Sequence, residues 1–120
     1  MRASVKPETG PVQERERLAA RIGVPLSAIE AFCDRWGVEE LALFGSVLRD
    51  DFGPDSDIVI LVRFKAGRTP GLFVAARIRR ELADMYHRRV DLVHRPTIER
   101  SRNYIRRKEI LGSARVVYAA

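Results

Sequence analysis

Residues 43–59 read LFGSVLRDDFGPDSDIV and join two apolar segments through a polar connection. The first segment, residues 41–44, has the length of a buried strand and ends at Gly45 and Ser46. Because glycine has no Cβ, a phosphate group can approach the backbone closely there. The serine hydroxyl and the amides of a following helical turn can donate hydrogen bonds to that phosphate. The pair therefore predicts an anion-binding bend at the end of a strand.

Two aspartates are placed where they could meet beside this bend. The second apolar segment, residues 57–64, is predicted to be a strand in which Asp57 and Val59 share one face, because side chains alternate along a strand. A third strand is predicted over residues 90–93, where Asp91 stands among apolar neighbours. An unpaired carboxylate is costly to bury, which favours a cation or a hydrogen-bond donor beside Asp91. If the two strands are neighbours, about 4.8 Å apart, the aspartates converge on one spot.

The rest of the chain predicts helices around these strands. Residues 1–13 have no apolar period and are predicted to be a flexible tail, and residues 14–120 are predicted to form one domain. The apolar spacing and the glycine and proline positions predict helices over residues 14–22, 27–36, 72–87 and 97–111, with an edge strand over residues 115–118. Helices and strands therefore alternate along an α/β (α+β) chain.

Composition limits the class of protein. The 120 residues are 46% hydrophobic and 32% charged, which is typical of a folded domain with a single core. No apolar run is long enough for a membrane span, so a cytoplasmic location without membrane contact is expected. The formal net charge of +6 favours an acidic partner, which could be nucleic acid, a nucleoside triphosphate or a protein surface.

From residue 26 to residue 120 the chain resembles the minimal nucleotidyltransferases (MNT) of the polymerase-beta-like superfamily. These short proteins are antitoxins that accompany HEPN-domain ribonuclease toxins in type VII-like systems. The resemblance is carried by LFGS (43–46), Arg49, GPDSDI (53–58), GRTPGL (67–72), VDLV (90–93) and YAA (118–120), in this order. It implies the nucleotidyltransferase fold, in which helices pack on a small mixed sheet.

The resemblance also implies an activity and a site. It implies a protein adenylyltransferase that transfers AMP from ATP to a tyrosine of a HEPN toxin, with which it forms a hetero-oligomer. Gly45 and Ser46 match the phosphate-binding pair, and Arg49 matches a nearby basic residue that contacts phosphate. Asp57 matches the first Mg²⁺ ligand, and Asp91 matches the third carboxylate, which acts as metal ligand and base.

The position of the second metal ligand is occupied by Val59, which has no oxygen. Loss of one such electrostatic element typically lowers the rate by about 10² to 10³ or more. The resemblance therefore implies an impaired adenylyltransferase. The alternative is an inactive subunit that neutralises its toxin by forming a complex with it.

Two other functions compete with these. The arginines of residues 97–111 could neutralise nucleic-acid phosphates. However, no repeated pattern of aromatic residues is interleaved for stacking on bases and no helix-turn-helix pair is evident, so nucleic acid is not the expected partner. Nucleotide transfer to a small molecule usually needs an additional substrate-binding domain, for which 120 residues leave no room.

Overall fold

A four-stranded mixed sheet forms the centre of the protein, which we describe from a computed structural model covering residues 12–49, 52–53 and 55–120. The strand order is β3-β2-β1-β4. β1 (Val38–Phe44) runs antiparallel to β2 (Ile58–Phe64) and to β4 (Arg115–Ala119), and β2 runs parallel to β3 (Val90–His94). The predicted α+β class with a small mixed sheet is confirmed.

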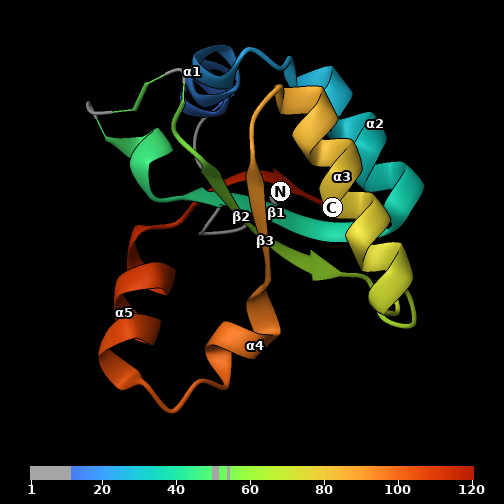
Figure 1. Ribbon diagram of the computed structural model, residues 1–120, viewed down its shortest axis with the longest axis vertical. Coiled ribbons are helices and arrows are strands. Elements are labelled where there is room, and N and C mark those ends of the chain that lie inside the picture. The colour runs from blue at the N-terminus through green and yellow to red at the C-terminus, as the bar shows by residue number, and fades with distance from the viewer. Residues whose placement is uncertain (1–11, 50–51, 54) are drawn as a thin grey trace, which may run out of the picture.

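Three helices cover one face of the sheet (Figure 1). They are α1 (Val12–Ile22), α2 (Leu26–Trp36) and α3 (Leu72–Tyr86). Their apolar stripes pack on the alternate strand residues that point to this face, and the shared core includes Ile29, Phe32, Leu41, Leu43, Ile58, Ile60, Val62, Ile78 and Leu82. This layer fixes which strand residues are left for the opposite face.

The opposite face carries two shorter helices, α4 (Arg95–Glu99) and α5 (Tyr104–Ser113). A smaller core packs beneath them and contains Ala42, Leu61, Ile110 and Val116. Ion pairs attach α4 to the sheet: Arg95 Nη1 lies 2.8 Å from Glu40 Oε1, and Arg63 Nη2 lies 2.5 Å from Glu99 Oε2. The site residues at positions 59 and 91 belong to this second face.

The prediction of a single basic helix over residues 97–111 is wrong, because the chain forms two helices there. α4 ends at Glu99, and the Asn103 side chain accepts a hydrogen bond from the Arg106 amide at 3.1 Å, which caps α5. The Ser101 hydroxyl accepts another from the Asn103 amide at 3.2 Å. Short polar side chains compete with helical hydrogen bonds in this way, so they end one helix and begin the next.

The ends of the predicted elements shift slightly. The predicted tail lies outside the described residues except for residues 12 and 13, which already belong to α1. β2 begins at Ile58, so Asp57 directly precedes the strand in which it was predicted to lie. None of the helices in the described ranges is both long and apolar enough to cross a membrane.

Candidate functional site

The bend after β1 has a backbone shape that only glycine adopts easily. Gly45 has φ 95° and ψ −146°, and residues Ser46–Leu48 form a single 3₁₀ turn, η1. The Leu48 amide donates to the Gly45 carbonyl at 3.0 Å and thereby closes the turn. A side chain at this φ and ψ would be strained, which explains the glycine. The predicted bend is therefore formed at the end of β1.

Val59 lies against this bend. In the sheet it is level with Phe44 of β1 on one side and with Asp91 of β3 on the other. A Cβ built on Gly45 would stand 3.6 Å from Cγ2 of Val59, which is ordinary van der Waals contact. The position where the resemblance implies a carboxylate thus presents methyl groups to the backbone of the bend.

Asp91 shares the face of Val59. The next residues of the same alternation, Leu61 and Val93, both pack in the core beneath α4 and α5. The Asp91 side chain is exposed on this face, so it is not the buried carboxylate that the apolar run predicted. Because water can hydrate this carboxylate, it does not need a neighbouring cation as a buried carboxylate would.

Asp57 stands at the entrance to β2 and is joined to both the bend and β3. The Ser46 hydroxyl lies 3.5 Å from the Asp57 carbonyl oxygen, at the limit of a hydrogen bond. The Asp57 carboxylate lies 3.9 Å from Arg89 Nη1, and both side chains are largely exposed. The Ile58 amide donates to the Arg89 carbonyl at 3.0 Å, so Asp57 and Arg89 enter the sheet at the same level.

The aspartates are diagonal neighbours on adjacent strands. Asp57 is level with Arg89, and Val59 is level with Asp91, so the two carboxylates are two positions apart along the strands. Within the described parts of the chain, no group of three histidine, cysteine or acidic side chains could hold a metal ion. The residues present do not fit the three-carboxylate metal set that the resemblance implies.

Arg49 lies where the resemblance implies a phosphate contact. It follows η1 directly and its side chain is exposed, while its carbonyl accepts a hydrogen bond from the Arg21 guanidinium of α1. This second contact ties the end of the turn to α1. The phosphate-contacting role of Arg49 stays a prediction.

The sequence did not single out Arg88, which holds the connection between the bend and Asp57. Its Nη1 donates to the Gly53 carbonyl at 2.7 Å and to the Ser56 carbonyl at 2.9 Å. Its guanidinium carbon lies 4.1 Å from the centroid of the Phe52 ring. Arg88 therefore holds the two carbonyls of Gly53 and Ser56 shortly before Asp57.

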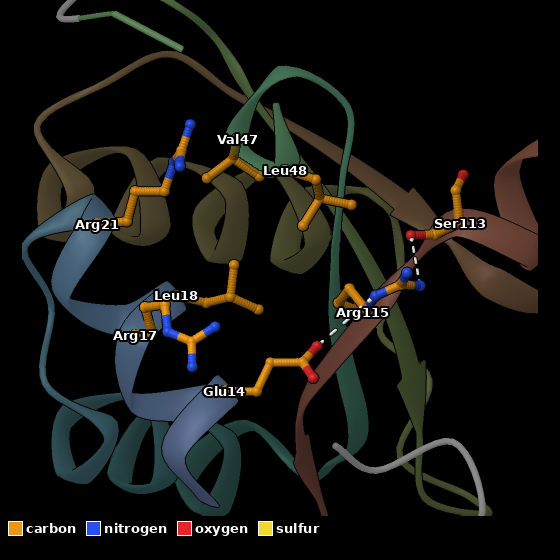
Figure 2. A pocket seen from close by; sticks show the side chains of 8 residues that line it. All are labelled: Glu14, Arg17, Leu18, Arg21, Val47, Leu48, Ser113 and Arg115. Atoms are coloured by element: carbon orange, nitrogen blue, oxygen red, sulfur yellow. Dashed lines mark hydrogen bonds and ion pairs between the residues drawn. The ribbon is translucent and has the colours of Figure 1, made fainter. Parts of the chain in front are cut away.

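Two hollows lie near the predicted site residues. One, of about 350 Å³, lies beside Asp57 and is lined by Asp55, Ser56, Asp57, His87, Arg88 and Arg89. The other, of about 350 Å³, lies between α1, η1 and β4 (Figure 2) and is lined by Glu14, Arg17, Leu18, Arg21, Val47, Leu48, Ser113 and Arg115. Figure 2 shows Arg115 between Glu14 and Ser113. Its Nε lies 3.6 Å from Glu14 Oε1, and its Nη1 donates a hydrogen bond to the Ser113 carbonyl at 3.2 Å. The first hollow is lined by Asp57, and the second is lined by Val47 and Leu48 of η1, between Ser46 and Arg49.

The fold is that of an α+β domain with a glycine bend at the end of β1, next to Asp57 and Val59. The nucleotidyltransferase domain matches this chain over residues 27–116. The chain therefore belongs to the nucleotidyltransferase domain family, whose members use a nucleoside triphosphate and a divalent metal ion.

Solved structures agree with this assignment. A protein proposed to be a minimal nucleotidyltransferase is 33% identical, with a TM-score of 0.59 over 83% of this chain and 92% of its own. A toxin–antitoxin complex with AMP-PNP shares the fold at 18% identity, with a TM-score of 0.60 over 79% of this chain and 73% of its own. A mutant MntA–HpeT toxin–antitoxin complex also shares the fold at 16% identity, with a TM-score of 0.59 over 81% of this chain and 75% of its own. No curated protein is significantly similar in sequence.

Proposed function

We propose that this chain is the antitoxin of a HEPN/MNT-type toxin–antitoxin pair, descended from protein adenylyltransferases that transfer AMP from ATP to a toxin tyrosine. It binds ATP at the Gly45–Ser46 bend, its AMP transfer is impaired, and it acts in the cytoplasm as a hetero-oligomer with its toxin. The family match, the similar minimal nucleotidyltransferase and the toxin–antitoxin structures of the same fold support this proposal.

A single observation carries the impairment: Val59, level with Asp91, has its Cγ2 3.6 Å from where a Cβ on Gly45 would stand. A carboxylate there would face the phosphates that the bend receives. A valine can neither hold a cation nor accept a proton, and its methyl groups make the position apolar. Because the acidic set is incomplete, we assign no step of the reaction to a metal ion.

The remaining residues can bind a nucleotide without completing its chemistry. The Ser46 hydroxyl and the amides of η1 that precede Leu48, whose own amide closes the turn, are suited to the phosphates. Asp91 is accessible and can accept a proton from an attacking hydroxyl. Binding and orientation are therefore retained while the electrostatic stabilisation of the transferring phosphate is reduced.

The second candidate, neutralisation by complex formation alone, is favoured by the pairing of Asp57 with Arg89 at 3.9 Å. The Arg89 guanidinium places a positive charge beside that carboxylate, and because both side chains are largely exposed the pair itself adds little stability. A chain in this state can cover its toxin stoichiometrically. The two candidates differ only in whether slow AMP transfer still occurs.

Toxin inhibition with and without ATP tests the proposed function. The HEPN ribonuclease is titrated with this chain, its RNA cleavage is measured, and its mass reports any bound AMP. We expect inhibition that is complete near equimolar chain, depends little on ATP, and leaves most toxin unmodified. Inhibition by a small fraction of the chain only when ATP is present would show an efficient enzyme. A toxin that stays active in both conditions would contradict the antitoxin assignment.

A further inference from the structure

Two large apolar side chains at the start of α3 are almost fully exposed. Leu72 is 85% exposed and Phe73 is 88% exposed, and Ala76 lies exposed one turn farther along the helix. The opposite side of α3 is buried against the sheet through Ile78, Leu82 and Tyr86. Exposed apolar residues that lie together on a folded domain mark interaction surfaces. This side of α3 therefore has the composition of an interface.

A hollow continues this apolar surface toward the edge of the sheet. It measures about 230 Å³ and is lined by Leu72, Ala75, Ala76, Arg79 and Leu92. Leu92 belongs to β3, the outermost strand on that side of the sheet, and α3 packs beside this strand (Figure 1). We call Leu72, Phe73, Ala76, Arg79, Arg80 and Leu92 the α3–β3 surface.

The positive charge of this surface indicates which kind of partner binds it. Arg79 and Arg80 are exposed on α3 and form no ion pair with any residue that the structure describes. A second copy of the chain, with its formal charge of +6, would bring arginines against arginines. A partner that combines carboxylates with apolar side chains would match both the arginines and the exposed Phe73.

The spacing of the surface favours a helical occupant. Phe73, Ala76 and Arg80 recur at three and four residues and so form one ridge along α3. Helices pack by fitting such a ridge into the groove of a second helix, and amphipathic helices bind apolar grooves in the same way.

We propose that the α3–β3 surface binds an acidic amphipathic helix of the toxin. Apolar side chains of that helix cover Leu72 and Phe73, and its carboxylates pair with Arg79 and Arg80. This inference rests on the proposed function, because the partner is the toxin named there. It assigns the surface through which the complex forms, away from the Gly45–Ser46 bend at the other end of β2.

A second exposed apolar pair provides the matched control. Tyr104 and Ile105 at the start of α5 are 59% and 76% exposed. The Tyr104 ring already has Arg107 and Lys108 near it, at 5.5 Å and 5.9 Å from its centroid. Ile105→Ser therefore removes a comparable exposed apolar side chain from the opposite face of the sheet.

The test measures toxin affinity by calorimetry for the wild type, the double variant Leu72→Ser with Phe73→Ser, Arg80→Glu and the Ile105→Ser control. We expect the double variant to bind about 10-fold more weakly or worse, as for residues central to an interface. Arg80→Glu should also weaken binding, and the control should stay near the wild-type affinity. Unchanged melting temperatures are expected, because the substituted side chains are exposed.

Each contrary result has a distinct meaning. Unchanged affinity of the double variant overturns the surface and leaves the proposed function intact, whereas a wild type that binds no toxin contradicts both. A dimer of the chain alone that dissociates on Phe73→Ser would assign the surface to a second copy. Binding of the wild type, but not the double variant, to phosphatidylglycerol vesicles would assign it to a lipid surface. Either outcome would overturn the proposal.

Discussion

Gly45 is the residue on which the geometry of the bend depends most. Its φ of 95° with ψ of −146° lies in a region that other residues occupy only under strain. The space around it is not the reason for the glycine, because an added Cβ would make only an ordinary contact with Val59. The requirement is conformational.

Gly45→Ala should therefore lower the free energy of unfolding by about 1 to 3 kcal/mol, the usual cost of such a backbone conformation. Urea denaturation measures the change. Gly53→Ala is the matched control, since Gly53 has no positive φ and its added Cβ would meet nothing within 4 Å. Equal effects of the two substitutions would show that the backbone of the bend is not restrictive.

Arg88 is the second decisive side chain, because it binds two carbonyls of the connection that leads to Asp57. Hydrogen bonds from a charged group contribute about 1.5 to 3 kcal/mol each. Arg88→Ala should speed amide hydrogen exchange over residues 52–57 and weaken ATP binding, and Arg88→Lys should recover only part of both because lysine lacks the planar fork. Exchange and affinity that match those of an Arg80→Ala control would contradict this role.

At the scale of elements, α4 is attached to the sheet by charge as well as by apolar packing. Arg95 and Glu40 pair at 2.8 Å, with side chains only 15% and 8% exposed. Arg95→Leu alone should lower the free energy of unfolding by about 3 kcal/mol, because it leaves a buried carboxylate with its strongest partner removed. Adding Glu40→Leu should recover much of that loss, as denaturation curves of the two variants will show. A double variant less stable than the single one would contradict this account.

The sequence predicted some of these features correctly and missed others. The bend and the strands around it were predictable, because glycine, alternation and apolar runs act over a few residues. The separation of α4 from α5 was missed, since the caps formed by Ser101 and Asn103 outweighed an otherwise helical pattern. Arg88 was missed for another reason: its partners, Gly53 and Ser56, are more than thirty residues away in the chain.

At the scale of the whole molecule, the cysteine and the candidate site residues Val59 and Asp91 lie on opposite faces of the sheet. The core beneath α1, α2 and α3 contains Cys33, which is completely buried, and burial raises the pKa of this thiol to about 12. Val59 and Asp91 belong to the opposite face, whose core residues include Leu61. The lone cysteine therefore takes no part in the site.

Cys33 should consequently resist modification by Ellman's reagent in the native chain up to about pH 9, because the thiolate is the reactive form. Reaction should appear at the rate of global unfolding and become rapid in denaturant. The time course of absorbance measures this directly. Fast modification of the folded chain would show that the core opens locally at α2.

The central claim is that Val59 alone separates this chain from an efficient nucleotidyltransferase. The most direct measurement is the single-turnover rate of AMP transfer from labelled ATP to the toxin, in the presence of Mg²⁺, for the wild type, Val59→Asp and Val59→Asn. We predict that the aspartate raises the rate by about 10²-fold or more while the asparagine, similar in shape but uncharged, does not. Equal rates for the wild type and Val59→Asp, in chains that both bind ATP and toxin, would contradict the claim.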